Sequence, residues 1–154
     1  MFPIPLLTAQ TINKILEEAF KGTQFSLNPF WLATNDYSNA PRKVPSVATQ
    51  GTEPPIPASF ESVFRGEKVE EVVEWLRNKP KEAAIDGNFF AVLDKTVANG
   101  KVVIGRVGGY DLEDMENMEF MRFDAEFAAL MLYSVQPGRW EELRQSSGLA
   151  GIEY

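Results

Sequence analysis

The chain has 154 residues, of which 44% are apolar and 24% charged, and this suits one globular domain with its own core. It contains no cysteine and no histidine, which excludes disulfides, thiolate and Ser-His-Asp chemistry, haem ligation through histidine, and zinc sites built on these residues. Its 15 basic and 22 acidic residues give a formal net charge of −7, so we expect no binding to nucleic acid or to an anionic membrane surface.

The chain opens with a short apolar stretch, residues 1–7, which has no Lys or Arg before it and contains Pro3 and Pro5. A secretory signal needs a basic start and a longer apolar core. No segment approaches the roughly 18 apolar residues of a membrane span. We therefore expect a soluble protein located in the cytoplasm.

A first helix is predicted over residues 8–21. Thr8 suits the N-cap position, and Gly22 stands where a helix commonly ends. Apolar residues recur at helical spacing and predict one buried face, made of Ile12, Ile15, Leu16, Ala19 and Phe20.

Residues 25–35 predict a short strand, because an Asn28-Pro29 break precedes an apolar run that contains Phe30 and Trp31. Trp31 has two interpretations: a core residue, or a ring that stacks on a ligand. We take it as a candidate binding residue.

Residues 38–59 hold five of the ten prolines, and proline resists both helix and sheet. A connection of about 20 residues without regular structure is uncommon in a compact domain. It could be a lid over a pocket, an arm that grips a partner, or a tolerated insertion. We predict a single domain over residues 1–154 that carries this segment as a loop or insert.

A second helix is predicted to start near Ser59, to break at Gly66 and to continue through Asn78, with Pro80 ending it. Its apolar face comprises Val69, Val72, Val73 and Leu76. Its glutamates form the opposite face, which we interpret as solvated.

Three strands are predicted next, over residues 88–94, 101–107 and 118–124. The first two flank Asn99-Gly100, a strong hairpin signal. Side chains alternate in a strand, so Arg122 and Asp124 share one face of the third strand, and Met121 lies on the other.

Two helices close the chain, over residues 125–133 and 139–145. Asp124 can cap the first, whose buried stripe we predict to be Phe127, Leu130 and Met131. Trp140 and Leu143 pack the second. Together, the predicted helices and strands indicate an α+β fold: a small antiparallel sheet of three or four strands with helices packed on it.

The densest polar cluster contains Tyr110, Asp111 and Asp114 within a segment that has five acids and no base between residues 111 and 119. Carboxylates at this density could bind magnesium or calcium, form a solvated loop, or attract a basic partner. The spacing is not that of an EF-hand, and we expect a loop with no metal. Asp111 and Asp114 are candidates for partner binding, as is Trp140.

A second constellation lies at or near strand ends: Asp94, Arg106, Arg122 and Asp124. If the two arginines faced one side they could clamp a carboxylate or carbonyl oxygen. An adjacent Asp with a raised pKa could then act as acid or base, with Tyr110 as a donor to an oxyanion. The alternative is structural ion pairing. Asp94, Arg106, Arg122 and Tyr110 are our candidate catalytic residues.

The stretch over residues 90–150 resembles a domain-of-unknown-function family of small fungal and bacterial α+β proteins. The resemblance lies in four pieces: Phe90-Ala91-Val92-Leu93-Asp94-Lys95-Thr96, Gly100-Lys101-Val102-Val103-Ile104, Phe120-Met121-Arg122-Phe123 and Trp140-Glu141-Glu142-Leu143. It implies that Asp94 and Arg122 occupy particular places in the fold, and it implies no activity.

Two functions remain open. The first is a binding protein that recognises a protein partner through an acidic surface and the Pro-rich arm. The second is a cofactor-independent isomerase, lyase or cyclase, which would hold an apolar small molecule in a pocket lined by Phe, Trp and Met. Neither requires a cofactor, and we expect none.

Overall fold

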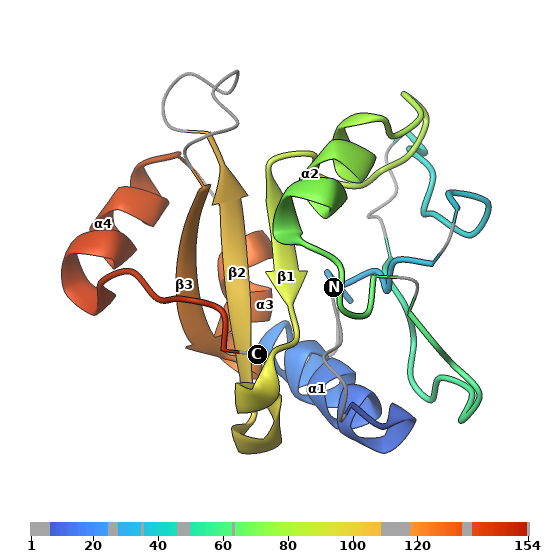
Figure 1. The fold of residues 1–154 in the computed structure, drawn as a ribbon, viewed down its shortest axis with the longest axis horizontal. Helices are drawn as coiled ribbons and strands as arrows, with labels where there is room; N and C mark the ends of the chain where they lie inside the picture. Colours follow the sequence, from blue (N-terminus) through green and yellow to red (C-terminus); the bar gives the residue numbers. More distant parts are fainter. Residues whose placement is uncertain are drawn as a thin grey trace.

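A computed structural model describes residues 7–24, 28–34, 36–45, 50–62, 64–108, 118–133 and 137–153. Within these ranges the chain forms four α-helices, one short 3-10 helix and an antiparallel sheet of three strands in the order β1-β2-β3 (Figure 1). The predicted α+β class and the antiparallel sheet are therefore confirmed.

The strands are β1 (Phe89–Val92), β2 (Lys101–Val107) and β3 (Met118–Asp124). β1 and β2 pair antiparallel, as the hairpin signal predicts, although a 3-10 helix, η1 (Lys95–Asn99), separates them. Gly100 ends η1 with φ of 73°, a left-handed conformation that glycine adopts without strain. The chain therefore turns at Gly100 as predicted, after a longer connection than a tight hairpin has.

Helix α1 (Ala9–Gly22) begins as predicted, because Thr8 Oγ1 accepts a hydrogen bond from the Thr11 backbone N–H. Helix α2 (Val69–Arg77) begins later than predicted. Gly66 has φ of 80°, which no residue of a right-handed helix adopts, so the predicted break at Gly66 is confirmed. Before that break, residues 59–62 form turn and irregular backbone with no helix. The predicted start near Ser59 is wrong.

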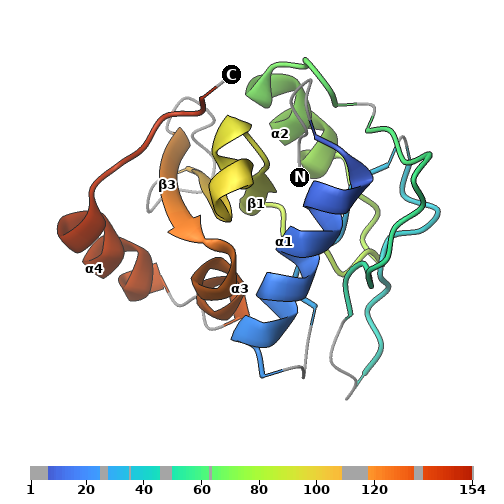
Figure 2. The ribbon, with the colours of Figure 1, turned by 90° about the horizontal axis from the view of Figure 1, so that it is seen from below.

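Helices α3 (Ala125–Tyr133) and α4 (Pro137–Ser147) complete the fold. The predicted buried stripe of α3 is wrong in two positions, because Phe127 and Leu130 are exposed. Alanines take their place: among the described side chains of α3, Ala125, Ala128, Ala129 and Met131 are buried. Small residues let α1 lie close against α3, as Figure 2 shows.

The sheet divides two groups of core residues. One face, with Ile104 and Met121, packs against α1, α3 and Trp140 of α4. The other face, with Val103 and Phe90, packs against α2. Figure 1 shows α2 in front of the sheet and α3 behind it.

Residues 28–34, the described part of the strand predicted over residues 25–35, form no strand. They meet the irregular chain at residues 50–52 through a few hydrogen bonds, among them Thr52 N–H to Phe30 C=O at 2.8 Å. Thr52 also uses its side chain, whose Oγ1 accepts from the Leu32 N–H at 2.9 Å. Because a side chain replaces part of the backbone ladder, no regular sheet forms here.

The described parts of the Pro-rich segment contain no helix or strand beyond one isolated bridge between Arg42 and Ala83. They nevertheless pack on the rest of the chain: Ile56 is buried, and its N–H donates to Asn13 Oδ1 on α1 at 2.7 Å.

Candidate functional site

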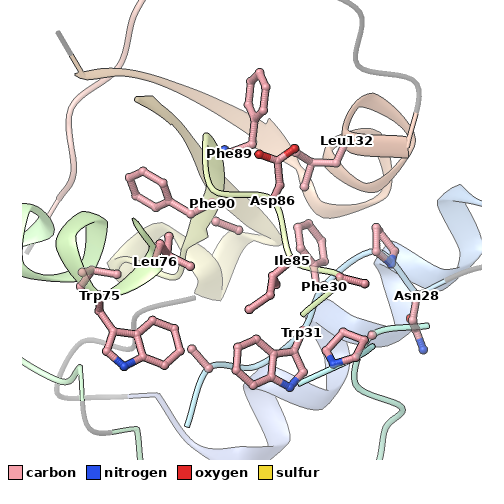
Figure 3. A pocket seen from close by; sticks show the side chains of 17 residues that line it. Asn28, Phe30, Trp31, Trp75, Leu76, Ile85, Asp86, Phe89, Phe90 and Leu132 are labelled. Carbon is pink, nitrogen blue, oxygen red and sulfur yellow. Dashed lines mark hydrogen bonds between the residues drawn. The ribbon is translucent and has the colours of Figure 1, made fainter. Parts of the chain in front are cut away.

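A pocket of about 240 Å³ lies beside β1, an edge strand of the described sheet (Figure 3). Its aromatic lining consists of Phe30, Trp31, Trp75, Phe89 and Phe90. Aliphatic groups of α2, α3 and the chain before β1 complete it, namely Val72, Leu76, Ile85 and Leu132. This composition, mostly apolar with few polar groups, is typical of a site for a small organic molecule.

The pocket follows the edge of β1 that faces away from β2 rather than one face of the sheet. Phe89, Phe90 and Ala91 are consecutive in β1, and all three line it. Neighbouring side chains in a strand point to opposite faces, so only a hollow along the strand's edge can touch all three. Helix α2 closes one side of this edge, with Trp75 one turn after Val72.

Trp75 is held rigidly in the pocket wall. The Tyr37 ring stacks on it, with ring centres 4.1 Å apart and planes 12° apart, and Phe64 meets it edge-on at 5.0 Å. The Tyr37 hydroxyl donates a hydrogen bond to the Trp75 carbonyl. Burial raises the pKa of Tyr37, so this donor keeps its proton at neutral pH. A wall fixed in this way is preorganised for a ligand.

Trp31 lies beside Trp75 with its ring nearly parallel, at 13°, and with the ring centres 6.1 Å apart. Both indoles are half-buried, so the pocket opens to solvent past them. Figure 3 shows the two rings along one side, with Leu76, Ile85 and Phe90 facing them. Of the two sequence-predicted binding residues that the structure describes, Trp31 lines this pocket and Trp140 does not.

Two polar side chains belong to the pocket lining, Asn28 and Asp86. Asp86 is exposed, and its Oδ1 accepts from the N–H groups of Asn88 at 2.7 Å and Phe89 at 3.2 Å. It therefore fixes the turn into β1. The side-chain oxygen of Asn28 is buried and has no hydrogen-bond partner in the part of the chain described, a costly state for a polar atom.

Asp94 and Arg122 lie away from this pocket and bind each other. Arg122 Nη2 donates to Asp94 Oδ2 at 2.9 Å and to the Gly151 carbonyl at 2.8 Å. Burial by itself would raise the pKa of Asp94. Hydrogen bonds from Thr96, from the Glu153 backbone and from Arg122 outweigh it and hold that pKa below its usual value. The raised pKa that acid–base chemistry would need is thus absent.

Arg106 belongs to a different cluster. Its Nη2 donates to Glu141 at 3.2 Å, and its guanidinium lies 5.4 Å from the ring centre of Trp140. Trp140, almost wholly buried, donates its Nε1–H to Glu119 at 2.9 Å. These contacts dock α4 on the sheet, which gives both Arg106 and Trp140 structural roles.

The two arginines do not share one side of the sheet, so the arrangement that a clamp would need is absent. Arg122 lies opposite Val103 in the β2–β3 ladder, three residues before Arg106. Because side chains alternate, an offset of three places the two arginines on opposite faces of the sheet. Asp124 lies at the strand end and pairs with Lys101 at 2.7 Å, largely in solvent.

The remaining candidates, Tyr110, Asp111 and Asp114, lie outside the described residues. Within the described ranges no three carboxylates come together as a metal site would require. No described helix has both the length and the apolarity to cross a membrane.

No family model, no curated protein and no solved structure matches this chain. The resemblance of residues 90–150 to a domain-of-unknown-function family therefore stays a prediction, and function has to be argued from the side chains themselves.

Sequence reasoning missed Trp75, Tyr37 and the aromatic pair Phe89-Phe90 as site residues. One signal was present for Trp75. It follows Val72 and Val73 in α2, so it widens the apolar stripe beyond what packing on the sheet requires.

Proposed function

We propose that this chain is a binding protein for a small, flat, apolar molecule, which occupies the pocket at the edge of β1. The observation that carries the proposal is the pair of nearly parallel indoles, Trp31 and Trp75, on a semi-open apolar pocket. Aromatic rings prefer to stack or meet edge-on with other aromatic groups, so an aromatic ligand suits these walls best.

The volume limits the ligand's size. A cavity of roughly 150 Å³ holds benzene, and pockets for drug-sized molecules span roughly 300–1,000 Å³. At about 240 Å³ this pocket suits a molecule of one or two rings.

Binding is favoured over catalysis because reactive groups are missing from the described lining. Asp94, Arg106 and Arg122 do not line the pocket. The carboxylate that does, Asp86, is exposed and already accepts two backbone hydrogen bonds. A general base must reach the proton that it removes and have a pKa tuned by its surroundings.

Recognition of a protein partner, our first expectation, has weaker support from the described surface. The large exposed apolar side chains there are Val44, Phe127, Leu130 and Leu149. Of these four, only Phe127 and Leu130 lie in the same helix, α3. An exposed apolar patch of two side chains is ordinary on the surface of a monomer.

A pocket-filling variant tests the proposal. Ala84 is half-buried in the lining. Its backbone N–H donates a hydrogen bond to the Pro41 carbonyl, and this bond does not depend on the side chain. Ala84→Leu should block the pocket, whereas Ala98→Leu, at an exposed position of η1, should not. The readout is the rise in melting temperature with naphthalene derivatives, since a ligand of the native state stabilises it by mass action.

We expect naphthalene derivatives to raise the melting temperature of the natural chain and of Ala98→Leu, and not that of Ala84→Leu. Equal shifts in all three proteins would place the ligand elsewhere. The absence of any shift in the natural chain would refute the proposed function.

A further inference from the structure

A shallow basic depression adjoins the pocket. Four of its lining residues are basic, Lys43, Arg77, Lys79 and Lys81, and none of the lining that the structure describes is acidic. This is unusual on a chain with 22 acidic and 15 basic residues. The charge of the described lining is therefore opposite in sign to the net charge of the chain.

The depression and the pocket share a wall. Leu76 lines both. Residues 86–89 also contribute to both, with Asp86 and Phe89 in the pocket and Gly87 and Asn88 in the depression. Lys79 lies across Gly87, with its Cε 3.6 Å from where a Cβ on that glycine would stand. A ligand seated in the pocket thus has positive charge within reach of one end.

The lysines of the depression form no ion pair with a carboxylate in the part of the chain that the structure describes. Among the described residues, Lys21, Lys95 and Lys101 each lie within 4.0 Å of an acidic side chain. No such ion pair involves Lys43, Lys79 or Lys81 in those same parts of the chain, nor Lys14 or Lys68, although Glu82 and Asp86 are near in sequence and exposed. What sets Lys43, Lys79 and Lys81 apart is that they line one depression. Like charges gathered in this way repel one another, and a bound anion would relieve that repulsion.

We propose that the ligand is an anion: a small aromatic carboxylate whose rings fill the pocket and whose charged group lies over Lys79 and its neighbours. This inference rests on the proposed function and adds the charge of the ligand to it. Lysine binds a carboxylate as a mobile point charge, which suits a shallow site that leaves the charged group partly hydrated.

The test compares acids with their matched amides. Naphthalene-2-carboxylate is titrated against naphthalene-2-carboxamide, and the pair is repeated with one or two methylene groups before the carboxyl carbon. Isothermal calorimetry gives the Kd of each compound for the natural chain, for the double variant Lys79→Met/Lys81→Met and for the control Lys14→Met. Lys14 is exposed on α1 and lies far from the depression in sequence.

We expect at least one acid to bind about two- to fivefold more tightly than its amide, with the preference weakening as ionic strength rises. The double variant should lose that preference and Lys14→Met should keep it. Acids and amides that bind the natural chain equally well would overturn the inference and leave the proposed function standing. So would a preference that survives in the double variant. If neither acids nor amides bind, the proposed function fails and the inference fails with it.

Discussion

Asp94 and Arg122 form an ion pair that reaches across the middle strand of the sheet. Asp94 follows β1 and Arg122 lies in β3, with β2 between them, and the two side chains meet at 2.9 Å. The Asp94 carboxylate is completely enclosed and also accepts the backbone N–H of Glu153 at 2.9 Å. The pair therefore ties both edge strands and the C-terminal segment to one buried charge.

The variant Asp94→Asn should be strongly destabilised. It leaves Arg122 without its buried counter-charge, and breaking such a pair costs about 3–5 kcal/mol. We expect a loss of about 3 kcal/mol in the free energy of unfolding, measured by urea denaturation. Asp124→Asn is the matched control, because it breaks a pair in which Asp124 is 68% exposed; its effect should stay within about 1 kcal/mol. Equal losses in both variants would contradict the role given to Asp94.

The contribution of Asp94 should depend on pH. Its pKa in the folded protein lies below the ordinary value of 3.8, so the unfolded chain takes up the proton first as the pH falls. The stabilisation is then complete above the ordinary value and is lost as the pH falls through it toward the folded pKa. The difference in unfolding free energy between the natural chain and Asp94→Asn should shrink from about pH 6 to about pH 3. A difference that stays constant over this range would contradict the assignment.

The elements whose own side chains define them could be predicted from the sequence. β2 and β3 match their predicted bounds, because each strand carries a run rich in apolar residues that turn-forming or polar residues bound. The buried residues of α3 could not be predicted from its own sequence, because the close approach of α1 determines which of them are buried. That contact selects Ala128 and Ala129 over Phe127.

The pocket could not be predicted from the sequence, and the reason is geometric. Trp31, Trp75 and Phe89 come from three separate segments, and only the packing of the whole chain brings them to one edge of the sheet. The positions of Arg106 and Arg122 depended on the register of β2 against β3. A shift of one residue would have moved Arg122 to the other face. The length of the connection between β2 and β3 does not determine this register.

Gly22→Ala should destabilise the packing of α1 on α3. A Cβ at Gly22 would lie 2.1 Å from the Glu126 carbonyl oxygen, and backbone cannot yield as a side chain can. We expect a loss of about 3 kcal/mol in unfolding free energy. In α4, no atom of the described residues lies within 4 Å of where a Cβ on Gly138 would stand, so Gly138→Ala should be neutral or stabilising by up to about 1 kcal/mol. Thermal denaturation of both variants measures the contrast, and a neutral Gly22→Ala would show that the two helices can move apart without penalty.

Tyr37 should control the pocket through Trp75. Tyr37→Phe keeps the stacked ring and removes the hydroxyl that donates to the Trp75 carbonyl, which should cost about 1 kcal/mol of stability. Tyr37→Leu removes the stack as well, so it should cost more and let the indole turn away from the ligand. Ligand affinity, measured with the naphthalene compounds, should therefore decrease from the natural chain to Tyr37→Phe and further to Tyr37→Leu. If both variants bind as tightly as the natural chain, Trp75 is positioned without help from Tyr37, and the preorganised wall is an incorrect description of this pocket.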